Sequence, residues 1–287
     1  MLSEALAGII IFISISLFII IVGGKIFSLF AREQIHYLYL IIFYARFPNA
    51  APPLTVPGPV SRYLTWAIGK NSHPAGCARV HYTGRTRFGA KGRWMKTKGE
   101  AIFACSTPGF TWHAKIAFAP MIWIDAFDYY VHGDAAVKLN LFSVLPLNNS
   151  HSSRIKTGSL FRYLASIPFF PIALSSSGSI TWEPVDDSTA KATIHDGDLS
   201  ARALFGFDSR GQIESIGIDS EDFQKQGTGA SGHFRQRYFG YTNIGGYQVP
   251  LQITSDMVLP DGKHACEEYT ITGIDYDCPA GHPWGGA

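Results

Sequence analysis

An uncharged apolar run near the N-terminus constrains this chain most. From Ala5 to Gly24 the sequence reads ALAGIIIFISISLFIIIVGG, and KIFSLF extends the apolar character to Phe30. About 20 such residues cross the hydrocarbon core of a bilayer as a helix. A secretory signal peptide would begin with basic residues and would have a shorter apolar stretch, whereas the only charge before this run is Glu4. We therefore predict an uncleaved transmembrane anchor over residues 1–34, with membrane lipids as its surroundings.

A second apolar segment, IHYLYLIIFYARF, follows at residues 35–47. It is too short to span a bilayer comfortably, which predicts that it lies in the interface or re-enters the membrane. Lys25, Arg32 and Arg46 follow the first run and no Lys or Arg precedes it, so the positive-inside rule taken alone places the C-terminal domain in the cytoplasm. If the two segments form a helical hairpin, the basic residues between them stay inside and the domain lies outside. The extracytoplasmic side is preferred and the cytoplasmic side stays open.

The domain organisation follows from a proline-rich stretch, PNAAPPLTVPGP, at residues 48–59. Proline-rich segments are stiff and mark boundaries between folded units. We assign residues 35–58 to the interfacial segment and linker, 59–277 to an antiparallel β domain, and 278–287 to a C-terminal tail. A short amphipathic helix is predicted at the start of the domain, with Pro59 in its first turn and Gly69 as its stop.

From about Gly76 apolar and polar residues alternate, which is typical of strands with one buried face. The segments include ARVHYTGRTRF, GEAIFACS, FTWHAKIAFAP, WIDAFDYYVHG and DAAVKLNLFSVLPL, and strand-like segments resume at SITWEPVDDST. The sequences DDST, DSRG, NIGG and PDG favour hairpin turns, so consecutive strands are expected to pair. Several segments exceed the mean strand length of about five or six residues, which predicts a broad curved sheet.

One helix interrupts this pattern, in SLFRYLASIPFFPIAL at residues 159–174. Leu160, Tyr163, Leu164 and Ile167 share one face at helical spacing, and Pro168 ends or kinks the helix. A helix of two or three turns is stable only when its apolar face packs on something else. The fold class predicted is therefore mainly β (α+β), with a transmembrane helix followed by a large curved antiparallel sheet that wraps around one or two short helices.

A family resemblance supports this architecture. PGPVSRYL, GRWMKTKGEAIF, TPGFTWHAKI, FDYYVHGDAAVKLNLFSVLPL, SLFRYLASIPFFPIAL, ITWEPVDDSTAKATIHDG, FGFDSRGQIESI and GYTNIGGYQVPLQITSDMVLPDG occur in this order over about residues 57–277. The ordered set resembles an uncharacterised bacterial domain family whose members often carry N-terminal membrane segments, which implies a bacterial cell membrane as the location. By its order of elements the family is similar to the LolA/LolB-like lipoprotein carriers, an open β half-barrel around helices. This is a likeness of fold and not of site.

The resemblance extends to single residues. The matching positions are Arg162, Tyr163, Trp182, Glu183, Pro184, Asp128, Gly133, Gly240 and Tyr241. Ser159 and Ser166 depart from the family pattern, which often has acidic residues there. Any chemical role of those carboxylates in relatives is therefore in doubt for this chain.

Composition and motifs exclude several functional classes. A net charge of +2 without a Lys/Arg-rich run argues against nucleic acid as a partner. No GxSxG, HExxH or GxxxxGK[ST] motif occurs, and no GxGxxG stands between a strand and a helix, since GTGASG at residues 227–232 is interpreted as a flexible loop. This argues against common enzymes and against a cofactor. The ten histidines are scattered singly, so no metal site is expected.

Asp125 and Asp128 are expected on opposite faces of one strand, so they are not expected to act as a carboxylate pair. Cys77, Cys105, Cys266 and Cys278 match no zinc or redox spacing, and four buried thiols are the preferred interpretation, although three pairings are open.

Aromatic residues supply the candidate site. Trp112, Trp123, Tyr130, Phe169, Phe170 and Trp182 flank the helix or lie on strands that could face it, and Arg162 and Tyr163 lie on the helix itself. An ordinary aromatic core explains this pattern, and we prefer that interpretation. The functional hypothesis is an apolar ligand cavity between sheet and helix, with IPFFPIAL as its mouth and Arg162 and Tyr163 as its polar groups.

Three functional hypotheses follow. The first is a non-catalytic membrane-anchored β domain that binds a partner protein or an apolar, lipid-like ligand. The second is an accessory structural subunit of a larger membrane complex of photosynthetic or respiratory type, with a membrane protein as partner. The third is an enzyme acting on a membrane-soluble substrate, which a cluster of titratable groups in the cavity would favour.

Overall fold

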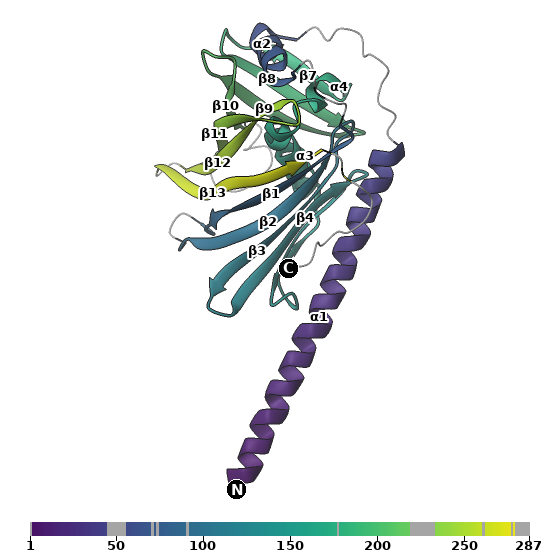
Figure 1. The fold of residues 1–287 in the computed structure, drawn as a ribbon, viewed down its shortest axis with the longest axis vertical. Helices are drawn as coiled ribbons and strands as arrows, with labels where there is room; N and C mark the ends of the chain where they lie inside the picture. The colour runs from purple at the N-terminus through teal and green to yellow at the C-terminus, as the bar shows by residue number, and fades with distance from the viewer. Residues whose placement is uncertain are drawn as a thin grey trace.

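A thirteen-stranded antiparallel sheet forms the body of the protein (Figure 1). The computed structural model describes residues 2–44, 56–69, 72, 75–89, 92–176, 178–218, 233–259, 262–276 and 278. Most of the predicted linker and all of the predicted tail after Cys278 therefore lie outside the described residues. The strands are β1 (Cys77–Thr86), β2 (Met95–Ala104), β3 (Phe110–Ala119), β4 (Ile122–Val131), β5 (Asp134–Leu141), β6 (Leu145–Ser150), β7 (Ile180–Pro184), β8 (Thr189–Asp196), β9 (Leu199–Phe207), β10 (Ile213–Gly217), β11 (His233–Ile244), β12 (Tyr247–Leu259) and β13 (Gly262–Asp275).

The strand order is β6-β5-β4-β3-β2-β1-β13-β12-β11-β10-β9-β8-β7. Strands that are consecutive in the chain pair throughout, as predicted, except β6 and β7, which form the two edges of the sheet. The contact between β1 and β13 joins the two halves, with Arg79 opposite Asp275 and Thr86 opposite Glu267. The fold class predicted from the sequence, a large curved antiparallel sheet around short helices, is confirmed.

The helices between β6 and β7 fill the concave face. They are α3 (Ser153–Ser166), the 3-10 helix η1 (Ile167–Phe169) and α4 (Ala173–Ser176). Because β6 and β7 lie at opposite edges, the chain that joins them must pass across the sheet, and Figure 1 shows α3 within its curve. At 14 residues α3 is longer than the two or three turns predicted, because Ser152 caps a start at Ser153 by accepting a hydrogen bond from Ile155 N.

The apolar face predicted for α3 is the one that packs on the sheet. Leu160, Tyr163, Leu164 and Ile167 are at most 1% exposed and belong to the main core. The Tyr163 hydroxyl donates a 2.7 Å hydrogen bond to the carbonyl of Ala104 at the end of β2. The predicted short helix at the start of the domain is α2 (Gly58–Ala67), whose Val60, Tyr63 and Ala67 close the same core.

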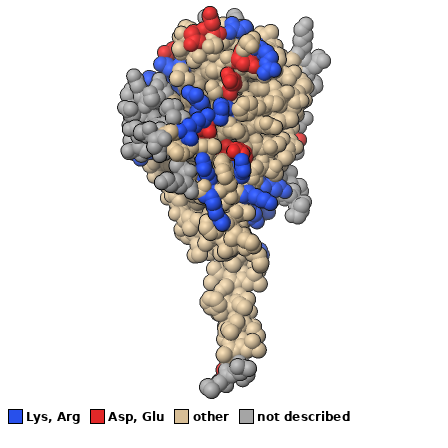
Figure 2. All heavy atoms as spheres, turned by 90° about the vertical axis from the view of Figure 1, so that its left-hand side faces the viewer, with Lys and Arg blue, Asp and Glu red and all other residues tan. Residues whose placement is uncertain are grey.

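The N-terminal helix α1 (Leu2–Tyr44) runs without a break for 43 residues. The two apolar segments therefore form one helix, and the alternative of a helical hairpin is wrong. The second segment packs on the domain, because its Ile35 and Leu38 are buried against the outer face of β2–β4. Phe27 and Ala31 of the first segment join them there, and Phe127 and Tyr129 belong to the same cluster. α1 is long and apolar enough to cross a membrane. Figure 2 shows its first half projecting beyond the domain with almost no charged side chain.

The segment DAAVKLNLFSVLPL, predicted as one strand, is a hairpin of β5 and β6. The turn was missed because it contains no glycine, proline, asparagine or aspartate. Phe142 and Ser143 adopt positive φ angles of 54° and 64°, a conformation that usually favours glycine or asparagine. The Val144 side chain after them lies against Gly23 of α1.

A disulfide joins Cys77, the first residue of β1, to Cys278 beyond β13. Their Cα atoms are 6.1 Å apart, within the range for a bridge. The interpretation of all four cysteines as buried thiols is therefore wrong for this pair. Cys105 is buried and Cys266 partly buried, and neither takes part in a disulfide. Sequence spacing could not show the pair, because only the pairing of β1 with β13 brings it together.

Candidate functional site

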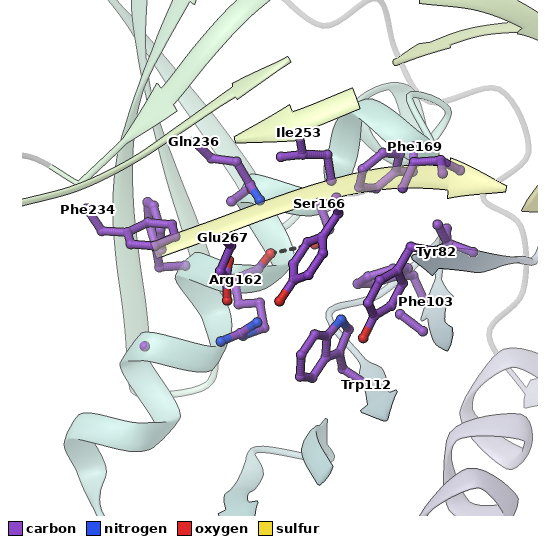
Figure 3. Close-up of a pocket in the computed structure, with 17 residues that line it drawn as sticks. Tyr82, Phe103, Trp112, Arg162, Ser166, Phe169, Phe234, Gln236, Ile253 and Glu267 are labelled. Atoms are coloured by element: carbon purple, nitrogen blue, oxygen red, sulfur yellow. Dashed lines mark hydrogen bonds between the residues drawn. The ribbon is translucent and has the colours of Figure 1, made fainter. Parts of the chain in front are cut away.

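A cavity of about 160 Å³ lies between α3 and the concave face of the sheet. Its wall is contributed by α3 and by strands of both halves of the sheet (Figure 3). The apolar part includes Val80, Phe103, Phe161, Phe169, Ile253 and Ile271. Strand residues on the inner face alternate with outward ones, so segments far apart in the chain supply neighbouring side chains. The polar part is smaller and consists of Arg162, Ser166, Gln236 and Glu267, with the hydroxyls of Tyr82 and Tyr269.

Arg162 is the central polar side chain of this cavity. Figure 3 shows it extending from α3 toward the strands, with Glu267 and Trp112 near it. Its Nε lies 2.8 Å from a carboxylate oxygen of Asp128 on β4, and its guanidinium carbon is 5.2 Å from the centre of the Trp112 ring. The side chain keeps 40% of its surface exposed. Arg162 therefore has donors available to a ligand in addition to those engaged by Asp128.

Asp128 is almost fully buried, with 5% of its side chain exposed. Burial raises the pKa of this carboxyl to about 6, although the charge of Arg162 and a hydrogen bond from Ser159 act in the opposite direction. The negative charge of Glu267 contributes further to the rise. Asp128 and Arg162 are both among the family-matching positions, and Ser159 is one of the two departures. The fold thus brings together residues that are 34 positions apart in the sequence.

Asp125 lies on the opposite face of β4, as predicted. Its carboxylate accepts a hydrogen bond from Trp123 Nε1 at 2.9 Å and one from the Ser143 hydroxyl, and it faces His113 at 3.5 Å. Burial alone would raise the pKa of Asp125, but these hydrogen bonds outweigh it and lower the pKa. This cluster supports the turn between β5 and β6 and does not line the cavity.

Of the eight residues predicted for the site, Trp112, Arg162 and Phe169 line the cavity. Tyr163 and Phe170 point into the core instead, where the Phe170 ring stacks on Phe103 at 4.9 Å. The other three, Trp123, Tyr130 and Trp182, lie elsewhere. Trp123 shares the outer face of β4 with Asp125, the Tyr130 hydroxyl donates to Asp196 at 2.5 Å, and Trp182 packs on Phe205.

Most of the wall was not predicted from the sequence, including the part that the C-terminal strands supply. Phe234, Gln236, Ile253, Glu267 and Tyr269 come from β11, β12 and β13. Their signal is present in the strand alternation, but nothing local indicates that β13 pairs with β1 and brings its inner face to the same cavity.

Comparison with known proteins gives the family of this chain. Residues 55–276 match DUF6920, described as a family of unknown function. The chain belongs to this family. The resemblance found in the sequence is therefore confirmed over nearly the same range. No curated protein matches the sequence.

Three solved structures show a similar arrangement to this DUF6920 domain. The first is a LolA superfamily protein from Nitrosomonas europaea, with 12% identity, a TM-score of 0.43, and coverage of 79% of this chain and 96% of that one. The second, from Vibrio parahaemolyticus, is described as an outer membrane lipoprotein-sorting protein domain, with 9% identity, a TM-score of 0.44, and coverage of 76% and 91%. The third is a DUF1329 family protein from Desulfovibrio piger, with 12% identity, a TM-score of 0.38, and coverage of 71% and 86%. These values describe overall arrangement and say nothing about a ligand.

The wall of the DUF6920 cavity combines an apolar surface with a few polar groups. Among the described residues of its wall there is no histidine or cysteine, and the Ser166 hydroxyl donates to the carbonyl of Arg162 at 2.9 Å within α3. The thiol of Cys105 lies in the core outside this wall, and burial raises its pKa, which keeps it protonated. No group of three possible metal ligands occurs among the described residues. An apolar surface with one guanidinium suits a molecule that has an apolar part and an anionic or polar end.

Proposed function

We propose that this protein is a non-catalytic, membrane-anchored domain that binds an apolar, lipid-like ligand in the cavity between α3 and the sheet. One observation carries the proposal: a mostly apolar wall surrounds the partly exposed guanidinium of Arg162, which Asp128 and Trp112 hold in place. An apolar chain would contact Val80 and Phe103, and an anionic head would take the remaining donors of Arg162.

The size of the cavity limits what enters it. Ligand sites commonly have volumes of about 300–1,000 Å³, and an apolar cavity of about 150 Å³ holds a molecule the size of benzene. At about 160 Å³ this cavity accepts a short apolar segment. A long acyl chain would enter in part, or α3 would have to move away from the strands.

The helix α1 supplies the membrane anchor in this proposal, with its first half in the bilayer. The disulfide between Cys77 and Cys278 favours an oxidising compartment, and hence the extracytoplasmic side, since disulfides are rare in the cytosol. The positive-inside rule favours the cytoplasmic side for the domain. Because α1 is one continuous helix, the rule depends here on Lys25 and Arg32, the basic residues close to the apolar span. We prefer the extracytoplasmic side, because a disulfide persists only where the compartment is oxidising.

An enzyme acting on a membrane-soluble substrate is the second candidate, and the raised pKa of Asp128 favours it. Buried ion pairs in purely structural roles also perturb pKa values. Because Asp128 is paired with Arg162, and the Ser159 hydroxyl that hydrogen-bonds to it lies outside the cavity wall, binding explains the site with fewer assumptions.

The test uses Gly158, a helical residue in the cavity wall where an added Cβ meets no atom within 4 Å. Gly158→Phe places a ring in the cavity, whereas Gly158→Ala leaves the cavity open and raises helix propensity by about 1 kcal/mol. The full chain and both variants are purified in mild detergent from native membranes. Native mass spectrometry and lipid extraction then identify every protein and lipid that remains bound.

We expect the wild type and Gly158→Ala to carry one defined lipid or fatty acid, and Gly158→Phe to lose it. A lipid retained equally by all three would overturn the cavity as the binding site. Stoichiometric protein partners without a bound lipid would replace the proposal by the accessory-subunit hypothesis. A bare monomer would overturn both.

A further inference from the structure

Three turns of the sheet lie at one end of the domain. They connect β1 to β2, β3 to β4, and β5 to β6, and antiparallel neighbours alternate in direction, so these turns share an edge. Figure 1 shows the turn between β3 and β4 at the height of the middle of α1. A Cβ at Gly23 would overlap the Val144 side chain, and a Cβ at Gly24 would lie 4.0 Å from Cβ of Ser143. The turn edge therefore lies at the level where the uncharged run of α1 ends.

Exposed apolar side chains gather at this edge. Outside α1, seven large hydrophobic residues of the described chain are exposed. Five of them lie at or beside the three turns: Phe88 (48%), Phe118 (45%), Met121 (90%), Leu145 (55%) and Leu147 (54%). Single exposed apolar residues need no explanation, but a group of them marks a contact surface. Met121 also has a positive φ of 61°, an unusual conformation for its residue type, in the turn that presents its side chain.

Basic and aromatic residues stand just above this edge. The guanidinium carbons of Arg85 and Arg87 lie 4.7 and 4.9 Å from the centre of the Trp94 ring, and that of Arg93 lies 4.6 Å from the Phe118 ring. Lys115 stacks on Trp123 in the same way at 4.9 Å. Figure 2 shows Lys and Arg gathered on the part of the domain next to the projecting helix. Tryptophan with basic residues above an apolar edge is the pattern found at bilayer interfaces.

We infer that this edge, named here the rim (Phe88, Phe118, Met121, Leu145 and Leu147, with Arg85, Arg87, Arg93 and Lys115), inserts into the surface of an anionic lipid bilayer. The inference rests on the proposed function, because the bilayer is the one that α1 spans. The continuity of α1 with the rim through Gly23 and Val144 argues for lipid as the occupant, and the positive charge of the rim argues for anionic lipid.

The rim gives the cavity an orientation. Glu267, in the polar part of the cavity wall, pairs with Thr86, the last residue of β1 before the first rim turn. Phe234, at the start of β11, lines the same end. The cavity thus extends toward the rim end of the strands, so that a lipid-like ligand would pass between bilayer and cavity over a short distance.

A matched pair of positions tests the inference. Leu145 in the rim and Val185 in the turn between β7 and β8 are each 55% exposed. The photo-crosslinking residue p-benzoylphenylalanine replaces each in the full chain, giving Leu145→p-benzoylphenylalanine and Val185→p-benzoylphenylalanine. Both are reconstituted into vesicles of phosphatidylcholine alone and of phosphatidylcholine with phosphatidylglycerol at 7:3. Mass spectrometry after illumination measures lipid adducts, and alkaline extraction of the same vesicles tests the anchor.

We expect at least a fivefold higher lipid-adduct yield at Leu145 than at Val185, with a further rise in the vesicles that contain phosphatidylglycerol. Equal yields at both positions with the protein resistant to alkaline extraction would overturn the rim and leave the anchor intact. Release of the protein by alkaline extraction would instead overturn the anchor in the proposed function. Adducts to protein and none to lipid at Leu145 would assign the rim to a protein contact and overturn the inference.

Discussion

Cys77 and Cys278 are 201 residues apart in the sequence and are joined by a disulfide that closes the β domain at both ends. The bridge spans nearly the whole domain, so it removes conformational freedom from a very long loop in the unfolded chain. It also secures the end of β13 beside β1, the contact on which the continuity of the sheet depends.

We predict that removing this bridge lowers the free energy of unfolding by about 2–5 kcal/mol. The variant is the double substitution Cys77→Ser with Cys278→Ser, which avoids a new unpaired thiol. Chemical denaturation of the full chain in mild detergent measures the change. Cys266→Ser, which alters a partly buried free cysteine, is the control and is expected to change stability much less. If reducing agent leaves the wild-type denaturation midpoint unchanged, the bridge contributes nothing.

The pKa of Asp128 predicts a dependence of stability on pH. Burial raises this pKa to about 6, from about 3.9 in an unfolded chain. Between these values the folded protein binds the proton more tightly than the unfolded chain, so the free energy of unfolding falls as pH rises from about 4 to 6. The fall attributable to this residue is on the order of 2–3 kcal/mol.

The comparison of wild type with Asp128→Asn isolates this effect, because all other titrating groups are common to both. Thermal unfolding of the full chain in detergent at pH 4.5, 6 and 7.5 gives the two profiles. We expect the melting temperature of the wild type to fall relative to that of the variant as pH rises. Parallel profiles would mean that Asp128 remains charged throughout and that Arg162 outweighs burial.

Much of the fold was accessible from the sequence because its strands alternate and its turns use Gly, Asn and Asp. The buried face of α3 was also accessible, since Leu160, Tyr163 and Leu164 repeat at helical spacing. The turn at Phe142 and Ser143 was not, because its conformation is imposed by its surroundings, including α1, and not by turn-forming residues. Sequence patterns report the backbone conformations that each residue type prefers, and Phe142 and Ser143 adopt a conformation that their residue types disfavour.

The site was less predictable than the fold, and Trp123 shows why. Alternation places Trp123 on one face of β4 and Asp128 on the other, but both faces of this strand are buried, one against the core and one against α1. An aromatic residue on such a strand does not reveal which face holds the cavity. Arg162 was predicted because it is a polar residue on the helix that interrupts the strands, whereas its pairing with Asp128 required the fold.

The docking of α1 on the sheet leads to a last prediction. Leu38 has no exposed surface and packs on the outer face of β2–β4, whereas Leu29 on the same helix is 63% exposed. Leu38→Ala should lower the free energy of unfolding by about 2–5 kcal/mol through the lost burial and the cavity left behind. Leu29→Ala should change it by less than about 0.5 kcal/mol. Because the substitution is the same on the same helix, differences in helix propensity cancel. Chemical denaturation of both variants in mild detergent measures the contrast, and equal effects would show that α1 is a tether with no stabilising contact to the domain.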